Sequence, residues 1–77
     1  MAMGVQNYNM YLLNGSFLEV YLKDGQTIRG KLHSAYLDAI LLYEGNNPSD
    51  PRFSLPAESQ TIIIIERNNV SHYRKLS

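Results

Sequence analysis

Two runs of alternating apolar and polar residues, joined by Asp24-Gly25, constrain this chain more than any other feature. Such alternation gives each run one apolar face and is typical of half-buried β-strands, and Asp-Gly favours a tight hairpin turn. The apolar positions are Leu18, Val20, Leu22, Ile28 and Leu32. Gly30 lies inside the second run, where strand interiors usually lack glycine, so we expect a bend or bulge there. A bent strand after a tight hairpin is what a small barrel requires.

The remaining sequence extends this hairpin into a mostly β domain. Apolar residues at helical spacing predict a short helix over 5–13, which Asn14-Gly15 ends. A long segment over 44–60 holds all three prolines and predicts a loop, and loops of this length tend to be functional or mobile. We expect one domain over 1–77, folded as a small, five-stranded, strongly bent antiparallel barrel with a short N-terminal helix. The five strands are predicted over 17–23, 26–35, 37–43, 61–67 and 69–75.

Composition narrows the class of protein. The 77-residue chain has no Cys and therefore no disulfide or zinc–thiolate site, and so small a domain is marginal alone, for which oligomer formation is an ordinary remedy. Seven Lys and Arg balance seven Asp and Glu, which lowers the expectation of nucleic-acid binding, although local patches matter more than totals. No apolar stretch approaches the ~20 residues that span a bilayer, and no signal peptide is evident. We expect a cytoplasmic protein without a membrane partner.

Four consecutive isoleucines, Ile62–Ile65, occupy the fourth predicted strand. Successive side chains of a strand point to opposite faces, so this run places apolar side chains on both faces. One face can meet the core of the domain. The other needs a cover, either from the same chain or from a second subunit, because a bare apolar edge strand is an aggregation hazard. We favour a subunit, since the 44–60 loop is too polar and rich in proline to cover much.

A short helix, five bent strands, a hairpin at Lys23-Asp24-Gly25 and a glycine five residues later resemble the Sm-like superfamily of Sm, LSm and bacterial Hfq proteins. The first Sm motif is similar to Leu22-Lys23-x-Gly25, Gly30-x-Leu32 and Ile40-Leu41-Leu42, and the second to Arg67-Asn68-Asn69-Val70. The resemblance extends from Phe17 to Tyr73. It indicates a divergent member of the superfamily, and one hypothesis is that the chain is encoded by a phage.

The resemblance implies an SH3-like barrel that assembles into a homo-oligomeric ring of about five to seven subunits by head-to-tail contacts. The fourth strand of one subunit pairs with the fifth strand of the next. This agrees with the expectation from the isoleucine run, which does not depend on the resemblance. The interface residues that follow are Ile62, Ile63, Ile64, Ile65, Val70 and Tyr73.

Tyr21 is the leading candidate for contact with RNA. It points away from the apolar face of its strand, and it matches the Tyr on which Hfq-like proteins stack adenine. Arg29 lies on the neighbouring strand, where Hfq has a base-reading Gln. Stacking contributes ~1–3 kcal/mol per base, so a ring of tyrosines could bind a purine-rich strand. The alternative is that Tyr21 packs across the strand pair against Arg29 or Lys31.

The resemblance also implies a base pocket on the pore side of the ring. Its positions hold Asp38, Ile40 and Arg67-Asn68 here. Asp38 repels phosphate and Ile40 cannot read a base edge, so we do not expect the uridine pocket of Sm rings to be intact. Arg67 could hold a phosphate or a base plane, or form an ion pair with a carboxylate of a neighbouring subunit. Tyr36 could stack on a base or pack on its own strand.

No catalytic constellation is evident. His33 and His72 lack Cys partners and metal-ligand spacing, so we expect no metal and no cofactor. There is no nucleophile elbow and no phosphate-cradling glycine-rich loop. We expect a non-enzymatic RNA-binding ring protein that holds single-stranded RNA by base stacking and phosphate contacts. The alternative is a homo-oligomeric ring scaffold for protein–protein interaction, with a degenerate RNA pocket.

Overall fold

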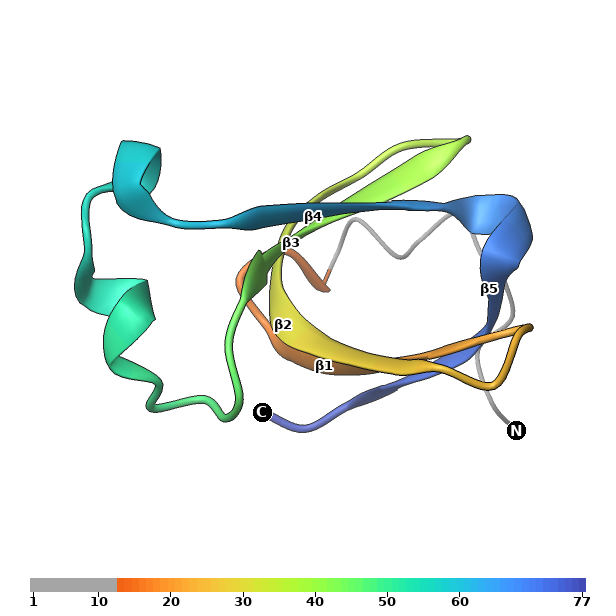
Figure 1. Cartoon of the computed structure of the whole chain (residues 1–77), viewed down its shortest axis with the longest axis horizontal. Helices are drawn as coiled ribbons and strands as arrows, with labels where there is room; N and C mark the ends of the chain where they lie inside the picture. The colour runs from red at the N-terminus through yellow and green to blue at the C-terminus, as the bar shows by residue number, and fades with distance from the viewer. Residues whose placement is uncertain (1–12) are drawn as a thin grey trace.

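A computed structural model describes residues 13–77 as one five-stranded antiparallel sheet (Figure 1). All five predicted strands are confirmed, with bounds within two residues of those expected. The helix predicted over 5–13 lies outside the described residues, apart from its last position. The strands are β1 (Phe17–Leu22), β2 (Thr27–Ala35), β3 (Ala39–Glu44), β4 (Ile62–Glu66) and β5 (Val70–Lys75).

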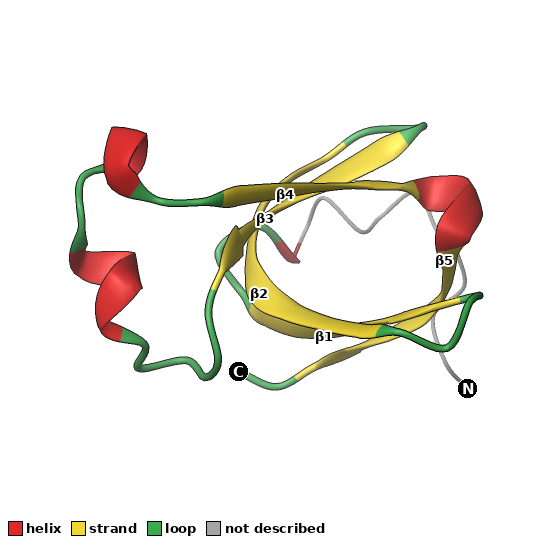
Figure 2. Cartoon of the chain, viewed as in Figure 1, coloured by secondary structure: helices red, strands yellow, loops and turns green. Residues whose placement is uncertain are grey.

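The sheet curls strongly but is not closed, so the expected barrel is only partly confirmed. The strand order is β4-β3-β2-β1-β5, which leaves β4 and β5 as the two edges. A short 3₁₀ turn, η4 (Arg67–Asn69), joins these edge strands (Figure 2). The backbone of η4 is tied to two loops, because Arg67 N donates to Asp38 O at 2.9 Å and Lys23 N donates to Asn69 O at 2.8 Å. These contacts direct β5 along β1 instead of back onto β4.

The β1–β2 hairpin turns at the predicted place. Gly25 N donates to Leu22 O at 3.1 Å, and Leu22 N donates to Gln26 O at 2.8 Å. Gly25 has a φ of 93°, while Asp24 keeps a negative φ and accepts a hydrogen bond from Gln26 N through Oδ1 at 3.0 Å. This is the pattern of a three-residue loop, a type I turn followed by a left-handed glycine. The hairpin predicted at Asp24-Gly25 is therefore confirmed, and Gly25 takes the left-handed conformation in it.

Gly30 allows β2 and β3 to approach closely. A Cβ at this position would lie 2.6 Å from the carbonyl oxygen of Tyr43 and 3.0 Å from Leu42 Cβ. The bulge of β2 lies a few residues further on, where the register with β3 shifts between Leu32 and Ser34. The bend expected at Gly30 is thus shared between a close backbone contact and a separate bulge.

The core fills the concave side of the sheet. Ile65 belongs to it and Ile63 packs against it, while Ile62 and Ile64 are 41% and 69% exposed. The isoleucine run therefore places apolar side chains on both faces, as expected. Three residues predicted at a subunit interface, Ile65, Val70 and Tyr73, contribute side chains to the core of the single chain. The buried cluster is Leu18, Val20, Leu32, Ile40, Leu42, Ile65, Val70 and Tyr73.

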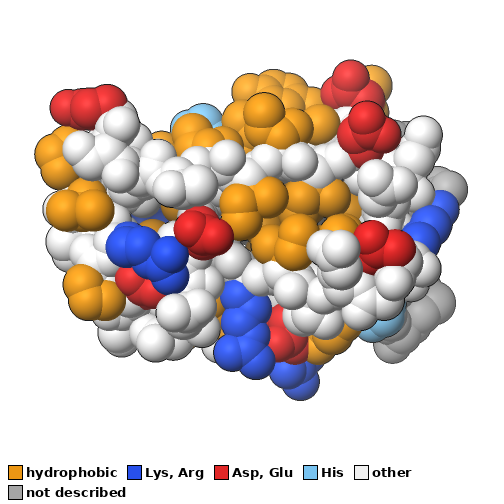
Figure 3. Space-filling model, in the orientation of Figure 1, with side chains coloured by type: hydrophobic (Ala, Val, Ile, Leu, Met, Phe, Trp, Pro, Cys, Tyr) orange, Lys and Arg blue, Asp and Glu red, His pale blue; other side chains and the backbone are white. Residues whose placement is uncertain are grey.

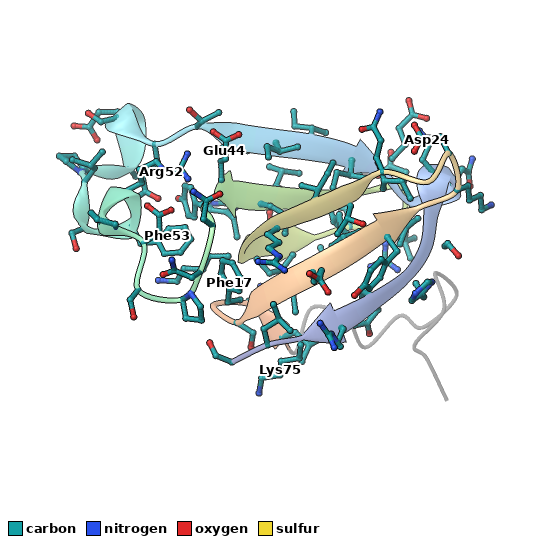
Figure 4. The ribbon with its side chains drawn as sticks, turned by 60° about the horizontal axis from the view of Figure 1, so that its bottom comes forward. Phe17, Asp24, Glu44, Arg52, Phe53 and Lys75 are labelled. Carbon is teal, nitrogen blue, oxygen red and sulfur yellow. The ribbon has the colours of Figure 1, made fainter. Side chains whose placement is uncertain are left out.

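The long β3–β4 loop is folded around one carboxylate. Asp50 accepts hydrogen bonds from Asn46 N at 2.8 Å and from Arg52 N at 2.9 Å, and it pairs with the Arg52 guanidinium at 2.8 Å. The Phe53 ring packs edge-on against Phe17, with centroids 6.0 Å apart (Figure 4). The contact between Phe53 and Phe17 attaches the middle of the loop to β1. The loop contains two 3₁₀ turns, η2 (Pro51–Ser54) and η3 (Ala57–Ser59).

Candidate nucleic-acid interface

The convex face of β2, β1 and β5 carries two rows of polar and aromatic side chains. In the first row Arg29 on β2 and Arg74 on β5 lie directly opposite Glu19 on β1. We call Arg29, Glu19 and Arg74 the arginine row. In the second row Thr27 and His72 lie opposite Tyr21, and these three residues form the aromatic row. Both rows point away from the core, because they alternate with the buried positions of β1.

Glu19 is the centre of the arginine row. Its Oε2 accepts a hydrogen bond from Arg29 Nε at 2.8 Å, and its Oε1 accepts one from Arg74 Nη2 at 2.8 Å and another from the Tyr21 hydroxyl. The Glu19 side chain is only 6% exposed, whereas those of Arg29 and Arg74 are 51% and 63% exposed. Hydrogen bonds from Tyr21 and then from the arginines lower the pKa of Glu19 from 4.5 to about 2. The carboxylate is therefore ionised at neutral pH.

The aromatic row holds Tyr21 in a fixed orientation. Its ring stacks on His72, with centroids 4.4 Å apart and an angle of 17° between the planes. Its hydroxyl bonds to Glu19, which raises the pKa of the Tyr21 phenol. The alternative expectation was that Tyr21 packs on Arg29 or Lys31 of β2, but the side chain stacked on Tyr21 is His72 of β5. One face of the Tyr21 ring is thus occupied by a second aromatic ring of the same chain.

An open groove of about 770 Å³ runs beside these rows. Ile28 and Ile63, which pack against the core, supply apolar side chains to its wall. Tyr21 and Arg29 line the same groove together with the carboxylates of Glu19 and Glu44. Arg29 Nη1 donates to the backbone oxygen of Asn46, which also lines the groove, at 3.5 Å. The structure therefore brings together the two predicted outer-face contacts, Tyr21 and Arg29, in one groove beside the convex face.

Charge on this convex face is locally positive although the chain is neutral. Among the outward positions of β1, β2 and β5, three side chains are basic (Arg29, Lys31 and Arg74) and one is acidic, Glu19. Figure 3 shows basic side chains next to an acidic one at the lower edge of the view. Lys31 Nζ lies 5.7 Å from the centre of the Phe53 ring, a cation–π contact that fixes its position.

The residues predicted on the pore side form a different and less basic surface. The turn after β2 and η4 lie together, joined by the backbone bond from Arg67 to Asp38. A groove of about 370 Å³ between them is lined by Leu37, Asp38, Ala39, Glu66 and Asn68. Tyr36 is 54% exposed, but Arg67 is only 5% exposed. Each of the two grooves has two carboxylates in its wall, but Arg29 in the first is half exposed, whereas Arg67 beside the second is buried. The second groove is therefore the poorer site for phosphate.

Three residues of the convex face, Glu19, His72 and Arg74, make contacts that the sequence did not predict. The alternating pattern of its strand indicates that Glu19 faces outward, yet its side chain is buried beneath two arginines. Arg74 and His72 lie more than 50 positions from their partners on β1. The signal that could have found them is the register of β1 with β5, which places each directly opposite its partner.

Comparison of the chain with models of known protein families, with curated proteins and with solved structures found no match. In the part of the chain from residue 13 to residue 77, no helix is both long and apolar enough to cross a membrane. Within the same range, no three His, Asp or Glu side chains are grouped as a metal site would need. The geometry of the convex face is therefore the observation from which we infer a function.

Proposed function

We propose that this chain is a non-enzymatic Sm-like protein that assembles into a homo-oligomeric ring of about five to seven subunits and binds single-stranded RNA. The observation that carries the proposal is the adjacency of the arginine row and the aromatic row on the convex face. Aromatic rings bind bases by stacking, and guanidinium groups bind phosphates through charge-assisted hydrogen bonds. A single strand is the favoured ligand, because only unpaired bases can leave their neighbours and stack on a protein ring.

A ring compensates for the neutral charge of the chain. Each subunit presents three basic side chains and one acidic side chain on the convex face. Repetition around a ring turns this modest local excess into a circular positive surface, which RNA can follow from subunit to subunit. The pore-side groove, with Asp38 and Glu66 at its wall, offers no such excess.

Both edges of the sheet are open among residues 13–77, and this supports the ring. Glu44 N donates to Thr61 O at 2.9 Å, so the alternate residues Ile62 and Ile64 direct their backbone groups away from β3, toward the open side of β4. An exposed apolar edge strand tends to pair with another chain. Pairing of β4 with β5 of a neighbouring copy satisfies both edges at once, and such head-to-tail contacts can close into a ring.

Titration of a labelled oligo-A strand, followed by fluorescence anisotropy over a range of salt concentrations, tests the proposal. We expect binding that weakens as salt rises, since phosphate contacts release counterions. Tyr21→Ala should weaken binding by about 5- to 150-fold, the equivalent of removing the stacking of one base. Tyr36→Ala, a matched change on the pore side, should leave affinity unchanged. Absence of binding at low salt, or an unaffected Tyr21→Ala variant, would refute RNA binding at this face.

A protein-binding ring scaffold is the second candidate. Exposed apolar side chains favour it, namely Leu37 at 76%, Ile64 at 69% and Tyr36 at 54%. Leu37 and Tyr36 lie together in the turn after β2, next to the acidic groove. A wild-type ring that binds neither oligo-A nor oligo-U at low salt would select this function over RNA binding.

A further inference from the structure

We infer that Glu19 is a positioning residue, whose buried carboxylate holds Arg29 and Arg74 together as a clamp for one phosphodiester group of the RNA. This inference rests on the proposed function and deepens it. It adds Arg74 and His72 of β5 to the site, and it assigns phosphate to the arginine row and a base to the aromatic row. The acidic residue thereby becomes part of the anion site instead of a charge that weakens it.

Both arginines converge on the same point. They lie on the two strands that flank β1, so their Cα atoms are about 10 Å apart, twice the usual spacing of neighbouring strands. Each side chain leans inward over β1 and reaches a different oxygen of Glu19, both at 2.8 Å. Without the carboxylate, two like charges would repel each other and extend into solvent. Glu19 therefore brings two cations to the centre of the face.

The arginines keep donors for a ligand. A guanidinium has five N–H groups in a fixed fork. Arg29 gives Nε to Glu19 and Nη1 to the Asn46 oxygen, and Arg74 gives Nη2 to Glu19. Both arginine side chains are more than half exposed while Glu19 is almost fully covered. An approaching phosphate thus meets guanidinium groups of net positive charge, with the carboxylate shielded behind them.

Fixing the arginines in advance favours binding. An unconstrained Arg loses rotamer freedom when it holds a ligand, whereas these two side chains lose it when the chain folds. Tyr21 lies two residues after Glu19 on the same face, about 6.8 Å along the strand. Its hydroxyl also bonds to Glu19, so the two rows are linked. A nucleotide with its base at the aromatic row can place its phosphate over the arginine row.

Glu19→Gln separates positioning from simple neutralisation, because the two roles predict opposite signs. The substitution adds one unit of positive charge to the face. If Glu19 only neutralises the arginines, RNA affinity should rise and its salt dependence should steepen. If Glu19 positions them, oligo-A affinity should fall about tenfold despite the added charge, the size of one charge-assisted hydrogen bond. The slope against log salt should become shallower by about 0.7 for each phosphate that the variant no longer binds.

The experiment uses the full chain, and the wild-type titration is its first arm. Absence of oligo-A binding by the wild type refutes the proposed function. If the wild type binds and the Glu19→Gln variant binds equally or more tightly, only the positioning role is overturned. Circular dichroism and native mass spectrometry confirm that each variant is folded and assembled.

Arg74→Lys provides a second test that does not depend on the folding of Glu19→Gln. Lys keeps the charge but cannot hold Glu19 and a phosphate with one planar fork. We expect several-fold weaker oligo-A binding with the salt slope unchanged. Arg52→Lys is the matched control, since Arg52 also pairs with carboxylates, Glu44 and Asp50, but outside the two rows. Equal affinities for the wild type, Arg74→Lys and Arg52→Lys would overturn the clamp.

Discussion

Gly30→Ala tests whether close approach of two backbones sets the curvature of the sheet. The added Cβ would lie 2.6 Å from the carbonyl oxygen of Tyr43, whereas ordinary contacts begin at 3.4 Å. The backbone of β3 must therefore recede by several tenths of an ångström. It has little room to do so, because β3 is also paired with β4 on its other side, Leu42 with Ile63 and Tyr43 with Ile62.

The expected loss of stability follows from two opposing effects. Overpacking of this kind costs about 1–3 kcal/mol of unfolding free energy. Alanine is favoured over glycine in a strand by about 0.5–1 kcal/mol, which offsets part of the loss. A net loss of about 1–2 kcal/mol remains, a large share of the ~4–12 kcal/mol expected for 77 residues. For a domain of this size such a loss lowers Tm by about 4–16 °C.

Thermal unfolding followed by circular dichroism at one fixed protein concentration measures this change, since assembly would make Tm depend on concentration. Gly45→Ala is the matched control. A Cβ there would meet the far end of the Phe53 ring, a side chain that can turn away, so its Tm should fall less. A Gly30→Ala variant with the Tm of the wild type would refute the view that this backbone contact limits how β2 and β3 approach.

Three further predictions follow from edges and carboxylates. Ile64→Pro should leave the sheet folded but yield single subunits in native mass spectrometry, because proline removes an N–H that points to the open edge of β4. Ile64→Val should assemble like the wild type, and a Pro variant that still forms rings would contradict pairing through β4. Because the pKa of Glu19 is lower in the folded chain than its ordinary value of 4.5, its carboxylate stabilises the fold at pH values above 4.5, and this stability is lost as the pH falls toward 2. Tm should therefore drop from about pH 5 downward and drop less in Glu19→Gln, and equal pH profiles of Tm would exclude this role. Asp50→Asn should speed tryptic cleavage after Arg52 about tenfold, measured by mass spectrometry, since the Asp50 carboxylate holds the β3–β4 loop together. An unchanged cleavage rate would show that other contacts hold the loop together.

Local pattern was sufficient to predict the strands. Period-two alternation predicts β1 and β2, apolar runs predict β3 and β4, and the Asp-Gly and Pro-rich signals separate the strands. These signals suffice because side-chain direction and turn preference depend on neighbouring residues alone. The loop length of the hairpin was not predicted, since Asp-Gly is compatible with both a two-residue turn and a three-residue turn that ends in a left-handed Gly25. The difference depends on the hydrogen bonds of Leu22, which composition does not reveal.

Contacts between distant residues could not be predicted in this way. Closure of the sheet depends on how η4 is tied to Asp38 and Lys23, and these bonds belong to tertiary structure. Glu19 looked exposed because its neighbours on the chain alternate regularly, yet Arg74, 55 positions away, covers it. Arg67 was a candidate for ligand contact, but its side chain is buried in the folded chain, and its neighbours in the sequence do not indicate this burial.

The two outer strands of the sheet, β4 and β5, are not alike, so any assembly through them has a direction. A subunit altered only at β4 can still pair through its intact β5 with β4 of a normal neighbour, but its own β4 cannot pair with another subunit. Mixed with unaltered copies, such a subunit would therefore act as a chain terminator. If the chain forms the proposed rings, a small proportion of this subunit would open them into short arcs.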